Sequence, residues 1–360
     1  MNKGTLVILS SGVALGAYIP PLIIHNQLKE KGVDTQFYVI ENLIRKDKQD
    51  NILKNKFAFH RDFNVALVGQ KLSQKSDYGI DQELVETLFS QWRKVKIVNF
   101  LIFSGFWLPI IEKYIERYNI SDYKVDLCHL DSSISSSWKY KELNKSNFRH
   151  LWFYKLSDKK VNFCLKISES PPTKFKDRNN QFVIHGGGWG MGTYKEKINE
   201  LKKHKIKLDI INYEINDVEC EKTNGYRYFM IDPKWRTWDK YKSRYIFPPF
   251  GQLDNNNNIN YSCNASHPGV YDLIKDNYGI ISKPGGATLL DSFASGTPVI
   301  FLEPFGDYER DNATLWKNLG FGIDYEEWVS LGCATDILYQ MHFNIIKMSS
   351  KVQNFINLYV

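Results

Sequence analysis

The first forty residues alternate between strand-like and helix-like runs, and this alternation restricts the fold more than any other feature of the sequence. Residues 5–10 (TLVILS) are rich in β-formers, residues 20–32 show a helical apolar period that ends at a glycine, and residues 35–42 (TQFYVIEN) are again strand-like. A strand–helix–strand connection of this kind joins parallel strands. We therefore expect the chain to begin with the first unit of a parallel α/β sheet.

A second α/β series follows a polar linker at residues 168–180, which contains a Pro-Pro pair. Its strands are expected at residues 181–186, 207–214, 226–231, 278–282 and 297–303, with an amphipathic helix at 195–206. The 360 residues also exceed one usual domain core of roughly 100–200 residues. The prediction is two doubly wound, Rossmann-like domains, 1–167 and 181–345, facing across a cleft, with a C-terminal helix at 346–360 that packs toward the first domain. Ligands of such sheets bind outside the carboxyl ends of the strands.

Composition restricts the partners. Lys and Arg exceed Asp and Glu by 47 − 40 = 7, which suits an anionic ligand such as a diphosphate, or loose contact with an acidic membrane surface. No basic block is interleaved with aromatic residues, so nucleic acid is not expected as a partner. The five cysteines are widely spaced and form no C-x-x-C pair, which predicts neither a zinc site nor a disulfide framework and favours the cytoplasm.

Two apolar stretches bear on membranes. Polar residues and prolines interrupt the opening run, so we do not expect a cleaved signal peptide. The stretch 98–111 (VNFLIFSGFWLPII) is too short to cross a bilayer. We interpret it as core, with a hydrophobic lid or a docking patch at a membrane surface as the alternative.

A glycine-rich turn after the expected strand at 278–282 carries the chemistry. Gly285 and Gly286 allow a close approach of the backbone, and the helix that follows points its N-terminus at the turn, which favours a bound anion. Lys283 adds a positive charge, and Thr288 adds a hydroxyl on the first turn. Asp291, about one turn later, could accept hydrogen bonds from the vicinal hydroxyls of a ribose. The segment predicts a nucleotide-diphosphate site.

The segment 279–322 resembles the donor-binding signature of GT-B glycosyltransferases, such as plant UDP-glycosyltransferases, monogalactosyldiacylglycerol synthases and the N-acetylglucosaminyltransferase of peptidoglycan lipid assembly. The resemblance implies a diphosphate contact at Lys283 and a ribose contact at Asp291, where the family usually has Glu. It also implies that Glu309 holds the donor sugar. Tyr308 beside it departs from the family pattern. No metal and no cofactor other than the nucleotide sugar is implied.

A second glycine-rich loop, HGGGWGMG at residues 185–192, follows the first strand of the second domain. In the families named, a glycine- or serine-containing loop at this place contacts the diphosphate, which makes His185 and Gly187 candidates. A flexible turn is the alternative, and His185 could equally be an ordinary strand-end residue. Phe250, in a loop that ends a strand, is the candidate contact for the nucleobase.

An inverting sugar transfer needs a general base to take the acceptor's proton. In the resembling families a His of the first N-terminal loop serves, but Ala17 stands at that place here. Asp131, at the end of the strand DLCHLD, is the candidate catalytic base or the residue that orients it. His60, with Asp62 in a loop-like region (FHRDF), is the second candidate, and an ordinary surface histidine is the alternative.

These features together predict an inverting, metal-independent glycosyltransferase. The expected donor is a UDP-sugar, with a TDP-sugar second, and the expected acceptor is a small molecule or natural product. One alternative is transfer to a lipid acceptor at the membrane surface, with peripheral membrane contact. Another is a non-catalytic partner protein that binds a nucleotide sugar, and a third is a sugar-nucleotide epimerase.

Overall fold

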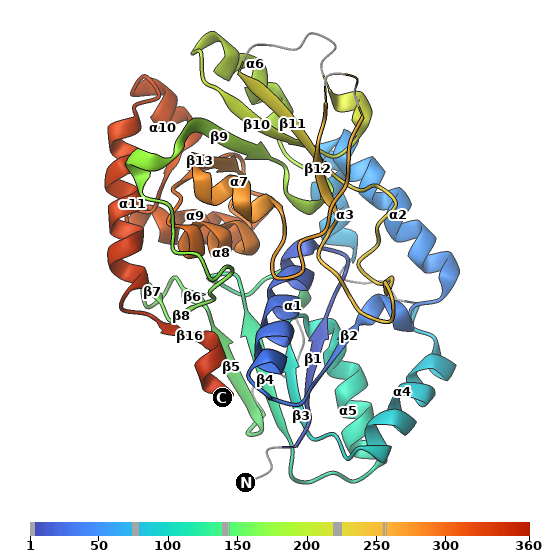
Figure 1. Cartoon of the computed structure of the whole chain (residues 1–360). Coiled ribbons are helices and arrows are strands. Elements are labelled where there is room, and N and C mark those ends of the chain that lie inside the picture. Colours follow the sequence, from blue (N-terminus) through green and yellow to red (C-terminus); the bar gives the residue numbers. More distant parts are fainter. Residues whose placement is uncertain are drawn as a thin grey trace.

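The computed structural model describes residues 4–73, 79–138, 143, 145–218, 225–254, 256 and 258–360. These residues form two α/β domains, each built around its own parallel sheet, with the N-terminal domain below the C-terminal domain in Figure 1. The two sheets and their covering helices are the two Rossmann-like units expected from the sequence.

The N-terminal sheet has the strand order β2-β1-β3-β4-β5, and all of its strand pairs are parallel. Every side chain of β1 is buried, as expected for a central strand that is covered on both faces. The strands are β1 (Leu6–Ser10), β2 (Thr35–Val39), β3 (Asn99–Ile102), β4 (Lys124–His129) and β5 (Phe148–Trp152). The helices are α1 (Leu15–Glu30), α2 (Lys46–Arg61), α3 (Phe63–Ser73), α4 (Gln82–Lys94) and α5 (Leu108–Arg117).

Helix α1 begins earlier than predicted and contains Pro20 and Pro21. A proline has no N–H for the carbonyl four residues before it, and this normally breaks a helix. Pro21 has no N–H to donate to the Ala17 carbonyl. That carbonyl instead accepts a hydrogen bond from the Ser10 hydroxyl (2.8 Å) and one from the Ser11 backbone N–H (3.4 Å). Groups at the end of β1 thus replace the missing helical hydrogen bond, and α1 continues through the prolines.

The apolar stretch 98–111 lies in the core of the N-terminal domain. It forms β3, a 3-10 turn and the start of α5, and Phe100, Leu101, Trp107 and Leu108 are each no more than 1% exposed. The core interpretation is therefore confirmed, and the alternative of a docking patch is wrong for these side chains. Among the residues that the structure describes, no helix has both the length and the apolar character needed to cross a bilayer.

The C-terminal sheet has the order β12-β11-β10-β9-β13-β14-β15, and only β12 is antiparallel. The order reverses between β9 and β13, the switch point at which doubly wound sheets bind ligands. The strands are β9 (Asn179–His185), β10 (Leu208–Asn212), β11 (Tyr226–Ile231), β12 (Phe250–Gln252), β13 (Asn277–Ser282), β14 (Val299–Phe301) and β15 (Gly322–Asp324). The helices are α6 (Tyr194–Lys203), α7 (Val270–Asp276), α8 (Gly286–Ser295), α9 (Asp307–Asn318), α10 (Tyr325–Ser330) and α11 (Thr335–Ser349).

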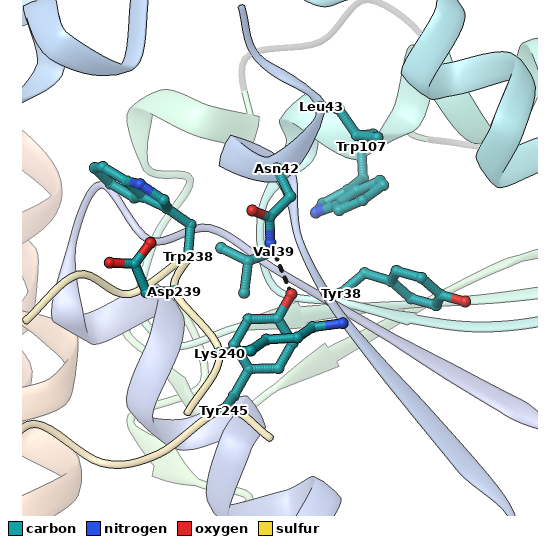
Figure 2. A pocket seen from close by; sticks show the side chains of 9 residues that line it. All are labelled: Tyr38, Val39, Asn42, Leu43, Trp107, Trp238, Asp239, Lys240 and Tyr245. Carbon is teal, nitrogen blue, oxygen red and sulfur yellow. Dashed lines mark hydrogen bonds between the residues drawn. The ribbon is translucent and has the colours of Figure 1, made fainter. Parts of the chain in front are cut away.

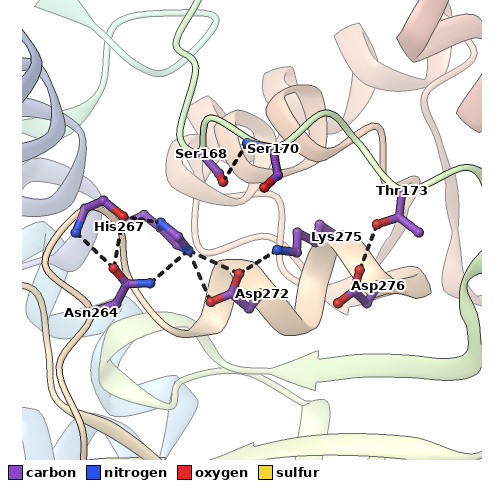
Figure 3. Close-up of polar contacts among 9 residues, drawn as sticks. Ser168, Ser170, Thr173, Asn264, His267, Asp272, Lys275 and Asp276 are labelled. Carbon is purple, nitrogen blue, oxygen red and sulfur yellow. Dashed lines mark hydrogen bonds and ion pairs between the residues drawn. The ribbon is translucent and has the colours of Figure 1, made fainter.

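The predicted linker is tied to the C-terminal domain. The hydroxyl of Thr173 donates to Asp276 at the end of α7 (2.7 Å; Figure 3). The Arg178 guanidinium donates to the Thr173 carbonyl (2.9 Å). Asp272, in the first turn of α7, contacts His267 at 3.1 Å. The two contacts of Thr173 fix the chain where it passes from one domain to the other.

The long segment 232–249 between β11 and β12 reaches from the C-terminal domain onto the N-terminal domain. The Thr237 hydroxyl donates to the carbonyl of Gly12 after β1 (2.9 Å), and the Tyr18 hydroxyl of α1 donates to the carbonyl of Ile246 (3.0 Å). A connection this long without helix or strand is uncommon in a compact domain. We call this segment the arm.

The C-terminal end differs from the single helix predicted at 346–360. Helix α11 ends at Ser349, and the chain then forms β16 (Gln353–Asn354), which pairs with β8 (Phe163–Cys164) of the N-terminal domain, and a 3-10 turn at Phe355–Leu358. The Asn354 side chain accepts the backbone N–H of Ile356 and starts this turn. Strand pairing with the first domain has replaced further helix, and the C-terminus lies beside the N-terminal sheet in Figure 1.

Candidate functional site

The loop between β13 and α8 carries Lys283, which is paired with Glu309 of α9. The Lys283 ammonium contacts one Glu309 carboxylate oxygen, and the other oxygen accepts the backbone N–H of Phe305 (2.7 Å). Both side chains are largely buried, and a Cβ atom built on Gly285 would lie 3.5 Å from the Lys283 ammonium and 3.4 Å from Glu309. Two residues predicted to contact different parts of one donor are therefore in contact with each other.

The N-terminus of α8 meets the end of β4 across the domain interface. A Cβ atom on Gly286 would lie 2.5 Å from the Leu130 carbonyl oxygen, so only glycine fits there. Asn312 of α9 joins the two domains: its amide nitrogen donates to Asp131 (2.9 Å) and to the carbonyl of Pro284 (2.9 Å), and its amide oxygen accepts the backbone N–H of Ser132 (2.7 Å). Asp131 is thereby held beside the Lys283 loop.

Burial dominates the electrostatics of Asp131. It raises the pKa of this carboxyl to about 6, against the hydrogen bond from Asn312, which lowers the pKa, and with the charge of Glu309, which raises it. A carboxyl with a pKa near 6 is mostly ionised at pH 7 and still basic enough to take a proton. Position and pKa both suit the predicted base.

His185 ends β9 next to this group. Its Nδ1 accepts the backbone N–H of Gly187 (3.0 Å), so the proton of the neutral ring lies on Nε2. Burial, followed by the charge of Lys283, lowers the pKa of His185 to about 4. Nε2 is buried and has no hydrogen-bond partner among the described residues. His185 thus offers a neutral N–H donor, and Gly187 (φ 71°) lies with its Cβ position 3.7 Å from Lys283 Cε.

Three further donor-site candidates lie on α8 and α9. Thr288 is buried on the first turn of α8. The Asp291 carboxylate has no hydrogen bond or ion pair with a described residue, and burial raises its pKa to about 7. Burial, followed by the charge of Asp291, raises the pKa of Tyr154 and of Tyr271. Tyr308 lies on the first turn of α9, directly before Glu309. Asp291 therefore lies near a tyrosine of each domain without a hydrogen bond to either.

Phe250 is buried against the neighbouring strand. Its ring stacks on Phe229 of the neighbouring strand, with 5.6 Å between the ring centres and 5° between the planes, and the residue is 9% exposed. The sequence interpretation as a nucleobase contact is corrected here, because β12 pairs with β11 and turns this side chain into the packing. Tyr261, on the segment that follows β12, lines a cavity of about 560 Å³ between the two domains.

His60 lies on α2 rather than in a loop, and it is buried. Nδ1 contacts the carbonyl of Gly190 (2.7 Å), and Nε2 contacts Asp217 (2.8 Å) and the Lys195 ammonium (2.8 Å). Both ring nitrogens are used to join α2 to the C-terminal domain, so the loop-like, acceptor-facing position predicted for His60 is wrong. A local sequence pattern could not show that Gly190 (φ 59°) leaves room for this imidazole.

The same contact brings together a possible metal-ligand set that the sequence did not predict. Ligand atoms of His60, Glu214 and Asp217 lie within 4.8 Å of one another. The Lys195 ammonium lies 2.6 Å from Asp217 and 2.8 Å from His60. Lys195 therefore supplies a positive charge at the place that an ion would take.

Asn312 and Glu41 are the site residues that sequence reasoning missed. Glu41 follows β2, is fully buried, and accepts the backbone N–H groups of Gly12 (2.6 Å) and Val13 (3.1 Å) and the Ser11 hydroxyl (2.8 Å). It fixes the loop in which the resembling families carry their histidine. The available signal for Asn312 was its place three residues after Glu309, within the segment 279–322 that resembles the donor-binding signature.

Aromatic rings surround a cavity of about 400 Å³ at the end of β2. Figure 2 shows Trp107 and Tyr38 of the N-terminal domain opposite Trp238 and Tyr245 of the arm, and the Asn42 amide donates to the Tyr245 hydroxyl (2.8 Å). Asp131 is not among the residues that line this cavity.

Comparisons with known proteins agree with this architecture. No protein-family model and no curated sequence matches the chain. Among solved structures, MurG of Acinetobacter baumannii is 12% identical, with 99% of both chains covered and a TM-score of 0.53. The glycosyltransferase SsfS6 of Streptomyces sp. SF2575, complexed with thymidine diphosphate, is 8% identical over 99% of this chain and 98% of its own (TM-score 0.54). The glycosyltransferase VinC with dTDP is 8% identical over 98% and 97% (TM-score 0.56).

These similarities cover nearly the whole chain and both domains. At such low identity they establish the fold and not the reaction. The chain has the GT-B fold, as its resemblance to GT-B glycosyltransferases predicted.

Proposed function

We propose that the chain is a glycosyltransferase that transfers a sugar from a nucleotide-diphosphate sugar to a small-molecule acceptor, with inversion at the anomeric carbon. The observation that carries the proposal is the contact between Asp131 of one domain and Asn312 of the other (2.9 Å), which holds a basic carboxylate beside the Lys283 loop. Two similar glycosyltransferase structures contain thymidine diphosphate, which supports a TDP-sugar as the donor, beside the UDP-sugar that the sequence resemblance implies.

In this reaction the acceptor hydroxyl gives its proton to the Asp131 carboxylate while its oxygen attacks the anomeric carbon. The bond from that carbon to the diphosphate breaks, and the nucleoside diphosphate leaves as an anion. Lys283, the His185 Nε2–H and the N-terminus of α8 stabilise the leaving charge. Glu309, which Lys283 holds in place, binds hydroxyls of the sugar, and Asp291 binds the ribose.

The proposal is tested by incubating the protein with UDP- and TDP-sugars and a panel of hydroxyl-bearing acceptors, and by measuring release of the nucleoside diphosphate. We expect acceptor-dependent release that Asp131→Asn abolishes. Binding of the nucleotide sugars should appear as a thermal shift, since a ligand at 100 times its Kd stabilises by about 2.7 kcal/mol. Failure of every nucleotide sugar to bind would overturn the proposal. Binding without turnover would favour a non-catalytic partner.

The cellular setting is part of the same proposal. We place the reaction in the cytoplasm and favour a small acceptor, since the apolar stretch 98–111 is buried and offers no docking surface. Co-sedimentation with anionic vesicles tests this choice. Quantitative pelleting of the pure protein would instead support transfer at a membrane surface.

A further inference from the structure

A cavity of about 560 Å³ lies between the domains, next to the Lys283 loop. Helix α2 lines it on the N-terminal side, and the ends of β10 and β11 line it on the C-terminal side. Gly187 belongs to its wall, and the Cβ position of Gly187 is 3.7 Å from Lys283 Cε. The cavity therefore borders the site already described but is formed by other residues, and its size suits a small ligand.

Three residues of the cavity wall carry hydrogen-bond donors, and the donor of the first has no partner in the part of the chain that the structure describes. Asn212, at the end of β10, is 5% exposed, and its amide nitrogen has no hydrogen-bond partner among the described residues. A buried polar group without a partner is rare and destabilises the folded state. The unpaired amide of Asn212 therefore points to a ligand that supplies an acceptor.

Lys56 of α2 is the second donor. No described carboxylate forms an ion pair with it, and its ammonium lies 5.4 Å from the Trp189 ring and 6.0 Å from the Trp238 ring. Burial lowers the pKa of Lys56 to about 8, while the charge of Glu41 raises it and that of Arg236 lowers it. Glu41 attracts this charge without binding it, since its oxygens accept hydrogen bonds from the loop after β1.

Arg236 of the arm is the third donor, and the carboxylates of the cavity do not neutralise this group. Arg236 is bound through one nitrogen to the carbonyls of Pro233 (2.7 Å) and Trp235 (3.2 Å). Of the acidic residues in the wall, Glu214 lies 3.8 Å from Arg61, and Asp232 accepts the backbone N–H of Lys234 (2.9 Å). The wall thus carries three cations, Lys56, Arg61 and Arg236, against two carboxylates, and its net charge is positive.

We propose that this interdomain cavity binds a phosphoryl group of a substrate through Lys56, Asn212 and Arg236. Donors from three separate elements suit the several oxygens of a phosphate better than a single carboxylate. The charge of Lys283 is already balanced by Glu309, so a diphosphate beside it needs further cations. The phosphoryl group belongs either to the nucleotide donor or to a phosphorylated acceptor, and in naming these sources the inference rests on the proposed function.

The test is isothermal titration calorimetry of the full chain with inorganic pyrophosphate, and separately with UDP and TDP. The variants are Lys56→Met, which removes the charge at similar length, Lys56→Arg, which restores a charge, and Asn212→Asp, which places a negative charge at the same shape. Lys54→Met, an exposed position on the same helix, is the matched control. Thermal unfolding shows that each variant is folded.

We expect wild type and Lys54→Met to bind pyrophosphate within twofold of each other. Lys56→Met and Asn212→Asp should bind it roughly ten- to a hundredfold more weakly, and Lys56→Arg should recover most of the loss. Absence of pyrophosphate binding by wild type, or a folded Lys56→Met that binds within twofold of wild type, would overturn the inference.

The nucleotides distinguish the two sources. If Lys56→Met also weakens UDP or TDP, the cavity holds the donor diphosphate. If UDP or TDP binding is unchanged while pyrophosphate binding falls, the cavity holds a phosphate of the acceptor. If pyrophosphate binds through Lys56 and no nucleoside diphosphate or nucleotide sugar binds at all, the phosphoryl site stands and the proposed glycosyltransferase function fails.

Discussion

The substitution Asp131→Asn removes the charge of Asp131 and keeps its shape. The amide oxygen of the new side chain can still accept the hydrogen bond from Asn312, which is 2.9 Å long in the wild type. The variant therefore leaves the contact between the domains in place. We expect the variant to have a lower turnover than the wild type but a more stable fold at alkaline pH.

The stability change follows from the pKa of Asp131, which burial raises from 3.8 to about 6. One pH unit corresponds to about 1.4 kcal/mol, so the charged carboxylate costs the folded state on the order of 3 kcal/mol. The folded protein holds this proton more tightly than the unfolded chain, so this residue's contribution to stability falls as the pH rises from about 4 to about 6. The variant escapes this loss and should be more stable at pH 8 by roughly 1–3 kcal/mol, with little difference at pH 4.

The assays are thermal unfolding at pH 4 and pH 8, and the pH dependence of kcat. At pH 8 the melting temperature should rise by a few degrees, since 1 kcal/mol is worth about 2–4 °C in a protein of 150–250 residues. Loss of a general base should lower kcat about 10²–10⁴-fold and remove an acidic limb of the wild-type profile near pH 6. Asp122→Asn, at an exposed aspartate before the same strand, should change neither quantity.

Two results would refute this reasoning separately. A variant that keeps more than half of the wild-type kcat at pH 7.5 would show that Asp131 is not the base. An unchanged melting temperature at pH 8 would show that the ionised Asp131 carboxylate does not destabilise the folded protein. Affinity for the nucleotide donor should stay near the wild-type value, because the donor contacts are assigned to other residues.

Three further predictions follow from the same contacts. Lys283→Ala should weaken UDP or TDP binding by about 1.5–3 kcal/mol in calorimetry. Glu309→Ala should weaken binding of the nucleotide sugar more than binding of the free nucleotide. Equal losses of affinity for the free nucleotide in both variants would contradict these separate roles. Asp291→Asn should raise the melting temperature much more at pH 8 than at pH 4, because burial raises the pKa of Asp291 from 3.8 to about 7 and the wild type loses stability as the pH rises from about 4 to about 7; parallel curves for both proteins would exclude the effect. His60→Gln should destabilise by about 1–3 kcal/mol in urea unfolding and raise the KM for the donor more than it lowers kcat, since His60 binds the Gly190 loop; a hundredfold fall in kcat alone would restore a catalytic role for His60.

Local sequence patterns sufficed for most of the fold. The strand at residues 226–231 has the predicted bounds, because a run of apolar and aromatic residues between turn signals is a sufficient local cause. The start of α1 could not be predicted, since the groups that satisfy it come from the end of β1. The end of α11 was missed for the same kind of reason: the pairing of β16 with β8 joins residues far apart in the chain.

The candidate site divides in the same way. Topology alone places the ends of β9 and β13, which carry His185 and the Lys283 loop, at one edge of the C-terminal sheet, and the end of β4, which carries Asp131, at the corresponding edge of the N-terminal sheet. Asn212, Lys56 and Asn312 could not be selected, because their significance depends on how the domains dock. Phe250 shows the opposite error, since an aromatic residue at a strand end becomes a core residue once its strand pairs.

Contact between the domains is a second reason for glycine in the two loops, in addition to the proposed phosphate binding. Gly286 is in contact with the Leu130 carbonyl, and a Cβ atom on Gly190 would lie 2.6 Å from the His60 ring. Each glycine loop therefore touches the opposite domain where a side chain would separate the two. Since Asn312 also bridges Asp131 and Pro284, the position of the proposed base and the shape of the proposed donor loop depend on one interface. A change that parts the domains should thus disturb donor binding and proton transfer together, even where it leaves every site residue intact.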